Sequence, residues 1–319
     1  MKSVRRIISK AAATGLSAAF ASLFAVSTAY AINVGVVWKG KSGMAERVLA
    51  GFQERLDEAS VGINVELHKA VPSAEKLDQI VKSYENSKQG MLVLRSNGAK
   101  YLSKNPPSIP AFIGAANHPK ALGVIRNLDA PEGKVTGVTY YIPLEGPLQS
   151  FMAMAPGVES FLLLSQTGHP ASAIDWKGTK KACDAIGIRC GQAYAANHDE
   201  LAAVMAREAG SYDAFILGNQ ANIFAGTSLV MKAAGNKPVF SYAEKGVDNG
   251  ALGGITPSDH KLGRMLADSV IAVLINNEPI DQVPVKTDPE PSVLVNMRTA
   301  GKLGIEIPLD VLNSAKIIE

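Results

Sequence analysis

Residues 33–67, NVGVVWKGKSGMAERVLAGFQERLDEASVGINVEL, contain two apolar patterns that decide the fold class. Asn33–Trp38 is a compact apolar run typical of a buried strand. Ser42–Ala59 repeats its apolar residues at three- and four-residue spacing, which predicts an amphipathic helix with Ser42 as its N-cap. Ile63–Leu67 predicts a second strand. A strand, a helix and a strand in this order indicate an α/β protein with parallel strands.

The same alternation continues along the chain in two series. The first adds strands over 91–94 and 109–114 and a helix that begins at Ser73. The second has strands over 160–165, 190–194, 214–217 and 238–240, and helices over 175–186, 199–209 and 221–234. Gly187 is the predicted C-terminal cap of the helix over 175–186. The strands are almost continuously apolar, which suits parallel sheets covered on both faces.

Two such series predict two doubly wound parallel-sheet lobes, joined by hinge strands. The β-branched and aromatic segment over 135–143 fits a hinge strand that passes from one lobe to the other. The later stretches over 251–255, 258–275 and 283–297 lack a series of their own, so we expect them to complete the two lobes through further crossings. We expect residues 32–138 with 243–284 in the first lobe, and 139–242 with 285–319 in the second.

The N-terminus, residues 1–31, has the organisation of a secretory signal peptide. A basic segment, Met1–Lys10, precedes the small and apolar stretch Ala11–Val26, and Ala29-Tyr30-Ala31 fits a cleavage site. We expect cleavage after Ala31 and a soluble protein in the periplasm. A membrane anchor is the alternative, but the apolar stretch is short for a span of ~20 residues. No cysteine follows the cleavage site, which disfavours a lipoprotein.

Composition and charge exclude several classes of protein. The 319 residues are 47% hydrophobic, which excludes a disordered chain. The chain has 32 basic and 29 acidic residues, but four of the basic ones lie in the leader, so 28 remain against 29 acidic ones. A nearly neutral mature chain argues against nucleic acid as a partner, because that binding depends on neutralising phosphates.

The two cysteines, Cys183 and Cys190, lie late in a predicted helix and at the start of the next predicted strand. An oxidising compartment permits a disulfide between them, which would pin one helix-to-strand turn. Two reduced thiols are the alternative. A metal site is disfavoured because no histidine clusters near either cysteine in the sequence.

The sequence lacks the motifs of common enzymes. It has no G-x-S-x-G elbow, no glycine-rich phosphate loop and no G-x-G-x-x-G after the first strand. Residues 73–76 match S-x-x-K, but Ser73 is explained as a helix N-cap. The five histidines are scattered without metal-ligand spacing. We therefore expect no catalytic residues, no cofactor and no metal.

Ligands of open α/β sheets bind outside the carboxyl ends of the strands. The residues that follow the predicted strands are Trp38, Lys39, Ser42, Arg95, Ser96, Asn97, Ala115, Ala116, Asn117, His118, Gln166, Thr167, His169, Asn219, Gln220, Tyr242 and Glu244. Most are uncharged and form hydrogen bonds.

Some of these residues suggest particular contacts with a ligand. Trp38 and Tyr242 could stack on a planar or apolar group. Ser96 and Asn117, with Asn97, could hold a carboxylate or another polar head group, and Glu244 could receive an ammonium. Each has a structural alternative: Trp38 as core packing, Asn97 with Gly98 as a turn pair, and Asn117 as a residue that shapes a loop.

Several longer motifs resemble one family. Residues 133–138, GKVTGV, are similar to its "G-x-V-T-G-V" crossover, and residues 262–264, LGR, to a helix start. Residues 110–119, 238–241 and 250–253 resemble its fourth strand with the following turn, its next hinge and the strand after it. Residues 295–308, VNMRTAGKLGIEIP, fit the C-terminal "V-N-x-x-x-A-x-x-L-G-I-x-I-P". The chain resembles the substrate-binding proteins of ABC transporters, with the type I periplasmic-binding-protein fold, in the family that includes tryptophan- and tyrosine-type binding proteins.

The resemblance implies capture of a small solute, such as an amino acid, and its delivery to an ABC permease in the inner membrane. The family's head-group residues map onto Ser96, Asn97, Ala116 and Asn117, and a later polar position maps onto Tyr242 or Glu244. The sequence departs from the family after the third strand, where Arg95-Ser96-Asn97 replaces Thr-Pro, and at Asn117-His118, which replaces Thr-Asp. The ligand-binding candidates are Trp38, Ser42, Ser96, Asn97, Ala116, Asn117, Gln166, Asn219, Gln220, Tyr242 and Glu244.

The partners expected are therefore a small molecule and a permease, with the protein itself a monomer. The same fold could instead present its ligand to a histidine kinase or a chemoreceptor, and the sequence does not separate these two roles. A secreted α/β enzyme without a known motif is a third reading. A DNA-binding regulator is disfavoured, because the export signal stands where a helix-turn-helix would be.

Overall fold

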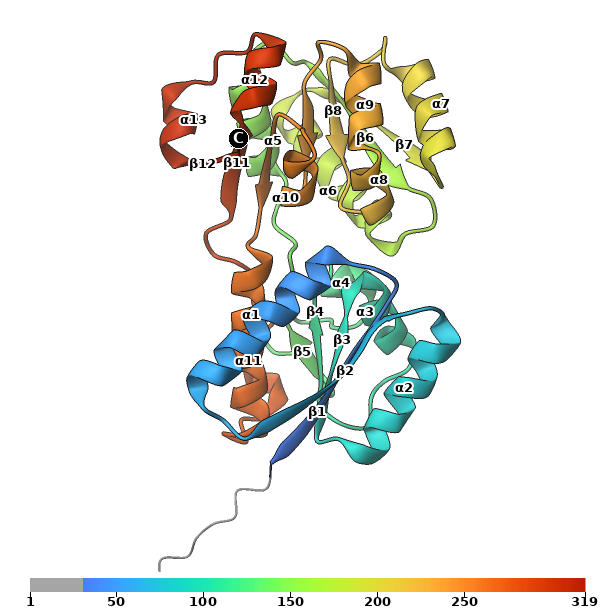
Figure 1. Cartoon of the computed structure of the whole chain (residues 1–319), viewed down its shortest axis with the longest axis vertical. Coiled ribbons are helices and arrows are strands. Elements are labelled where there is room, and N and C mark those ends of the chain that lie inside the picture. The colour runs from blue at the N-terminus through green and yellow to red at the C-terminus, as the bar shows by residue number, and fades with distance from the viewer. Residues whose placement is uncertain (1–30, 319) are drawn as a thin grey trace, which may run out of the picture. The chain divides into compact units, whose positions relative to one another are not determined.

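The computed structural model describes residues 31–318. The leader predicted for residues 1–31 lies outside the described residues except for Ala31, so its cleavage stays a prediction. Within 31–318, no helix is both long enough and apolar enough to cross a membrane. The strands of this part of the chain form two sheets, each with its own helices (Figure 1). This arrangement confirms the predicted α/β fold with two lobes.

The first lobe is built on five parallel strands in the order β2-β1-β3-β4-β5. These strands are β1 (Ile32–Lys39), β2 (Ile63–Val71), β3 (Gly90–Leu94), β4 (Ala111–Gly114) and β5 (Val135–Gly137). Its helices are α1 (Gly43–Ala59), α2 (Ala74–Ser87), α3 (Arg95–Lys104), α4 (Pro119–Leu122) and α11 (Asp259–Leu274), followed by the 3-10 helix η1 (Ile280–Gln282).

Strand β1 shows how the first sheet is covered on both faces. Val34, Val36 and Trp38 pack with α1 and α11 on one face, and Val37 packs with α2 and α3 on the other. Gly35 lies against the ring of Tyr84, where an added Cβ would be 2.4 Å from a ring carbon. The apolar run is therefore nearly continuous because both of its faces are buried, as predicted.

The second lobe contains a seven-stranded sheet in the order β12-β11-β10-β9-β8-β6-β7. Its strands are β6 (Ser160–Gln166), β7 (Arg189–Ala195), β8 (Ala214–Leu217), β9 (Val239–Ser241), β10 (Gly253–Thr256), β11 (Ser292–Asn296) and β12 (Ala315–Ile318). Its helices are α5 (Glu145–Met154), α6 (Pro170–Ile186), α7 (His198–Glu208), α8 (Ala221–Ala225), α9 (Thr227–Ala234), α10 (Glu244–Asp248), α12 (Met297–Leu303) and α13 (Leu309–Ser314).

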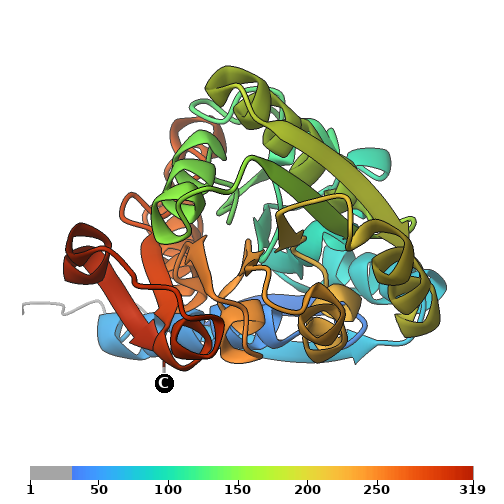
Figure 2. The ribbon, with the colours of Figure 1, turned by 90° about the horizontal axis from the view of Figure 1, so that it is seen from above.

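The second sheet also has helices on both faces (Figure 2). On one face Phe151 of α5 stacks on Phe240 of β9, with ring centroids 4.5 Å apart. Strand β11 runs antiparallel to β10, unlike the parallel pairs among β6 to β10. It does so because the chain enters it from the first lobe, after α11, rather than from a crossover helix of the second.

The chain passes between the two lobes three times within the described residues. The first passage follows β5, the second joins β10 to α11, and the third leads into β11. The first and third run side by side, with Lys286 N donating to Gly137 O (3.0 Å) and Thr139 N to Lys286 O (2.9 Å). Asp288 links the second and third, because it accepts from Ser258 N (2.9 Å).

The predicted boundary at residue 243 is wrong for the segment that contains α10 and β10. These elements were expected in the first lobe, but β10 pairs with β9 of the second sheet, Gly253 opposite Phe240. The short helix α10 makes a crossover between two parallel strands, and only after β10 does the chain leave the second lobe. The local apolar pattern is the same in either lobe, so it could not place the crossing.

Several helices also differ from their predictions, and the one predicted over 221–234 is divided at Gly226 into α8 and α9. Helix α6 begins at Pro170 rather than Asp175, because His169 caps it through Nδ1, which accepts from Ala171 N (3.2 Å). The turn expected at Asn97-Gly98 is instead inside α3, which starts directly after β3. By contrast, Ser42 and Gly187 cap α1 and α6 as predicted.

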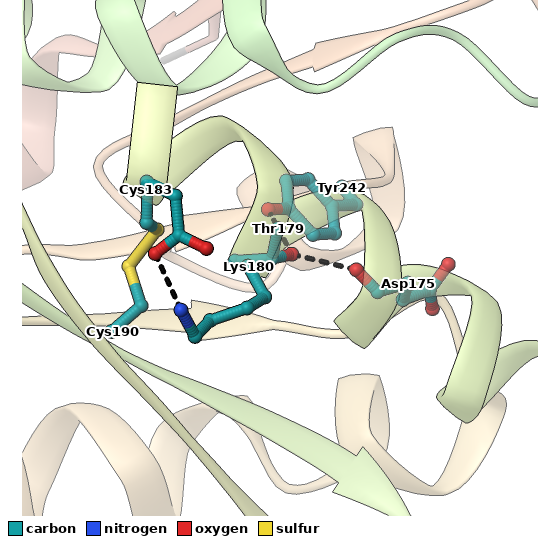
Figure 3. Close-up of a disulfide and its surroundings, with 7 residues drawn as sticks. Asp175, Thr179, Lys180, Cys183, Cys190 and Tyr242 are labelled. Carbon is teal, nitrogen blue, oxygen red and sulfur yellow. Dashed lines mark hydrogen bonds and ion pairs between the residues drawn. A yellow bond between two sulfur atoms is a disulfide. The ribbon is translucent and has the colours of Figure 1, made fainter. Parts of the chain in front are cut away.

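The disulfide between Cys183 and Cys190 is confirmed, with Cα atoms 6.2 Å apart. It joins the last turn of α6 to the start of β7 (Figure 3). Helix α6 also carries Asp175 and Thr179, and the hydroxyl of Thr179 lies 2.7 Å from that of Tyr242. The disulfide therefore fixes one end of a helix whose other end belongs to the candidate site.

Candidate ligand-binding site

A cavity of about 360 Å³ lies between the carboxyl ends of the strands of both sheets. It falls in the range of roughly 300–1,000 Å³ that small-molecule sites occupy. Its wall consists of Ser42, Gly43, Met44, Arg47, Arg95, Ser96, Ala115 and Tyr140 from the first lobe and its outgoing strand, and of His169, Asn219, Gln220, Ala221, Phe224, Ala225, Ala243, Lys245, Asp248 and Asn249 from the second. A second cavity of about 20 Å³ shares Tyr140 and Asn219 with it.

The first-lobe wall is formed where three strands end. Ser42 accepts a hydrogen bond from Ala45 N (3.2 Å) and so caps α1, whose N-terminus lines the cavity. Arg95 and Ala115 directly follow β3 and β4 with φ of +75° and +51°. Left-handed backbone is costly for residues with a side chain and is retained mainly where the surrounding structure requires it, often at functional sites.

Arg95 is a partly buried cation in this wall. Its Nη1 donates to the carbonyl oxygen of Lys39, and an added Cβ on Gly40 would be 3.2 Å from the same nitrogen. Burial lowers the pKa of Arg95. Among residues 31–318, no carboxylate pairs with it.

Asp175 forms the centre of a hydrogen-bonded contact between the lobes. Its Oδ1 accepts from Asn117 Nδ2 of the first lobe (2.7 Å). Its Oδ2 accepts from Gln220 Nε2 (2.7 Å) and from Asn219 N (3.3 Å) of the second. Burial raises the pKa of Asp175 to about 6, since these three donors offset the loss of solvation only in part. The contact joins the lobes across the floor of the cleft.

Two buried tyrosines complete this floor. Tyr140 places its hydroxyl 3.5 Å from Ser96 Oγ, which in turn accepts from Asn117 N (3.0 Å). Tyr242 places its hydroxyl next to Thr179 (Figure 3). Burial raises the pKa of both phenols, so both remain protonated donors at neutral pH.

His169 contributes a neutral imidazole to the second-lobe wall. Burial, with a smaller effect of the Arg95 charge, lowers the pKa of His169 to about 4. Its Nδ1 accepts from Ala171 N (3.2 Å), so in the neutral ring the proton is assigned to Nε2. The wall thus combines the cations Arg47, Arg95 and Lys245 with several uncharged donors.

Six of the predicted ligand-binding residues line one of the two cavities. Ser42, Ser96, Asn219 and Gln220 line the large one, and Asn117, Asn219 and Tyr242 the small one. Within residues 31–318, five others line neither: Trp38, Asn97, Ala116, Gln166 and Glu244.

The structure gives these five residues other surroundings. Trp38 is wholly buried in the core of the first lobe. Asn97 lies in the first turn of α3. Ala116 and Gln166 act through their main chains, because Ala116 O accepts from Tyr140 N (3.1 Å) and Gln166 N donates to Gln220 Oε1 (3.1 Å). Glu244 pairs with Lys316 at 2.7 Å.

Sequence reasoning did not select several residues of the site. Arg95 and His169 were among the strand-end residues, but their partial burial could not be foreseen. The sequence pattern predicts Tyr140 only as part of a hinge strand and Asp175 only as the start of a helix. Phe224 lies in α8, beyond the strand ends, and no sequence signal separated it from core residues.

Among residues 31–318, no group of three or more His, Cys, Asp or Glu side chains is placed to hold a metal ion.

Known proteins resemble the chain over most of its length. The "Tyrosine-binding protein" of Clostridioides difficile is 20% identical over 281 residues, which is 86% of this chain and 81% of that protein. An ABC domain in complex with L-Trp from Streptococcus pneumoniae superposes with a TM-score of 0.82 at 21% identity, covering 91% of this chain and 100% of that one. The ligand-free, open structure of a substrate binding protein with adhesive properties from Clostridium difficile superposes with a TM-score of 0.74 at 18% identity, over 90% and 99% of the two chains.

These structures establish the two-lobed fold as one shared with substrate-binding proteins. A sequence model of a protein family also matches residues 31–318, which are all the residues that the structure describes. The chain therefore belongs to the ABC transporter substrate binding protein family.

Proposed function

We propose that this protein is exported, captures an amino acid or a similar small molecule between its lobes, and delivers it to an ABC importer. The observation that carries the proposal is the cavity whose polar wall comes from both lobes. A ligand that contacts Ser96 on one side and Asn219 or Gln220 on the other makes all of its contacts only when the lobes are closed.

Closure follows from this difference in contacts. A ligand shifts a conformational equilibrium only by its differential affinity for the two states. Reversing a 1:99 equilibrium to 99:1 needs ~5.5 kcal/mol, which several hydrogen bonds together with apolar contacts can supply. The Asn117–Asp175 bond already joins the lobes at 2.7 Å, so the ligand adds to a contact that the protein itself provides.

The apolar part of the wall supports an organic ligand. Met44, Tyr140 and Phe224 offer a thioether and two rings to the cavity. A tyrosine-binding relative and an L-Trp complex are known for similar proteins. An amino acid or a molecule of similar size, with one apolar part and one polar head, matches this distribution.

Ligand binding is tested on the mature protein, freed of carried-over ligand by unfolding and refolding. Thermal shift against amino acids, nucleobases and small organic acids should find at least one stabilising solute, with its affinity then measured by calorimetry. Phe224→Ala should weaken that binding, whereas Tyr194→Ala, at a residue 47% exposed, serves as the matched control. If no solute stabilises the protein, and native mass spectrometry finds no bound molecule, the proposal fails.

Export and delivery need separate measurements. Cell fractionation should place the protein in the periplasm, with an intact mass that begins at Ile32. Addition of the ligand-loaded protein to vesicles that contain a candidate ABC permease and its ATPase should stimulate ATP hydrolysis. An uncleaved protein in the membrane fraction would contradict the predicted signal peptide. A rate of ATP hydrolysis that does not change when the loaded protein is added would favour a sensory role.

A further inference from the structure

The charged side chains around the large cavity are unevenly matched. Among residues 31–318, Arg47, Arg95 and Lys245 line it together with one acid, Asp248. Arg47 already pairs with Asp259, its Nη2 and Nε lying 2.7 Å and 3.0 Å from the same carboxylate oxygen. Lys245 and Arg95 are therefore the other cations of this wall.

Lys245 and Asp248 are both exposed and lie on the short helix α10, so solvent screens them. Arg95 is different, because it is partly buried and its identified polar partner is the neutral carbonyl of Lys39. Burying a cation without a partner anion is unfavourable. A guanidinium in this state is well suited to a planar carboxylate, which it can bind through two parallel hydrogen bonds.

No comparable group is ready for an ammonium in the part of the chain that the structure describes. Asp175 does not line the large cavity, and its two oxygens already accept three hydrogen bonds. Asp259 is taken by Arg47. Glu244, which the sequence suggested for an ammonium, pairs with Lys316 instead. Asp248 lines the cavity but is exposed, so it would give an ammonium only a partner that solvent screens. Among residues 31–318, a zwitterion would therefore bring an ammonium with no buried, unpaired carboxylate to meet it.

We infer that the ligand is a small organic acid without an α-ammonium group, and that Arg95 binds its carboxylate. The inference rests on the proposed function and narrows its ligand class. Met44 and Phe224 contact the hydrocarbon part of the acid. The hydroxyl of Ser96 and the ring Nε2–H of His169 are further donors for the carboxylate. The tyrosine-binding relative is only 20% identical over 281 residues, so the ligand of this chain need not be that of the relatives.

The test compares acids with amino acids of the same carbon skeleton. Ligand-free wild-type protein is titrated by calorimetry with 3-phenylpropionate and phenylalanine, 3-(4-hydroxyphenyl)propionate and tyrosine, 4-methylpentanoate and leucine, and glutarate and glutamate. In the pair that binds, the acid should be tighter by about tenfold or more, because the ammonium stays unpaired. Native mass spectrometry of protein purified without denaturation should show the mass of an organic acid.

Variants assign the preference to Arg95. Arg95→Gln should weaken binding of the acid by about tenfold or more and reduce its advantage over the amino acid. Arg95→Lys should keep part of the affinity, because it keeps the charge but not the planar fork. Arg126→Gln removes a guanidinium whose side chain is 88% exposed and should leave binding unchanged.

The outcomes separate this inference from the proposed function. If an amino acid binds as tightly as its acid, or tighter, or if Arg95→Gln folds and binds the acid normally, the inference is wrong and the proposed function stands. If the whole panel fails and no carried-over molecule is found, the proposed function fails as well. Should Arg95→Gln not fold, the wild-type comparison still decides the ligand class.

Discussion

Replacing Asp175 by asparagine should change how the stability of this protein depends on pH. The folded structure raises the pKa of Asp175 from 3.8 to about 6, chiefly through burial. The native state thus holds the proton more tightly than the unfolded state does. The stability that this gives is present below about pH 4 and is lost as the pH rises through about 6. At 1.36 kcal/mol per pKa unit, the loss is about 3 kcal/mol.

The comparison with Asp175→Asn isolates this effect. His169 shifts the other way, with its pKa lowered to about 4 by burial, so its contribution is lost as the pH falls from about 6.5 through 4. The two trends oppose each other in the wild type. In Asp175→Asn, an amide NH2 can face the Nδ2 donor of Asn117 in place of a carboxylate oxygen. This lowers the free energy of unfolding by about 1–3 kcal/mol, and the loss is similar at every pH.

The assay is urea unfolding at pH 4, 5, 6 and 7.5, followed by tryptophan fluorescence and circular dichroism. Trp38 lies in the first lobe and Trp176 in α6 of the second, so fluorescence reports on both. The free energy of unfolding of the wild type should fall by about 2–3 kcal/mol relative to Asp175→Asn between pH 4 and 7.5, because part of the effect is already lost at pH 4. Asp184→Asn, at a side chain 60% exposed on the same helix, controls for loss of a charge. If the difference in the free energy of unfolding between the wild type and Asp175→Asn stays constant from pH 4 to 7.5, the reasoning is refuted.

Two further changes test the packing. Gly263→Ala should lower the free energy of unfolding by about 1–3 kcal/mol, because its Cβ would lie 2.0 Å from the carbonyl oxygen of Val48 and force α1 and α11 apart. Gly301→Ala is the control, because a Cβ at Gly301 meets no described atom within 4 Å, and its free energy of unfolding should stay unchanged. Equal losses of stability in the two variants, measured by urea unfolding, would contradict this account. Cys183→Ser should lower the free energy of unfolding by about 2–3 kcal/mol by freeing the short loop to Cys190. Reductant should lower the melting temperature of the wild type and not of this variant, and an unchanged wild type would argue against the disulfide's role.

Local patterns determined much of the fold. Ser42 was recognised as a helix cap, Gly187 as a helix end, and the apolar runs as buried strands, because each depends on neighbours within a few residues of the chain. The short loop between Cys183 and Cys190 likewise made their pairing testable from sequence. The start of α6 was misplaced because histidine is an uncommon cap.

The site depended on contacts that no local pattern records. The strand-end residues Ser96, Asn117 and Asn219 line the candidate cavities, because the carboxyl ends of the strands meet there. Trp38 has the same position relative to its strand, but long-range packing against α1 and α11 buries it in the core. Whether a strand-end residue faces the cavity or the core depends on which distant segments pack over it. The apolar periodicity of the sequence does not record these contacts.

The sequence by itself therefore determined the α/β class and the two series of strands and helices, and it predicted the strand ends that line the candidate cavity. Only the tertiary structure decided that Asp175 joins the lobes and that, among residues 31–318, no carboxylate pairs with Arg95. The physical reason is distance along the chain. Asp175 meets Asn117 across 58 residues, and the state of a buried charge is set by every group that folding brings around it.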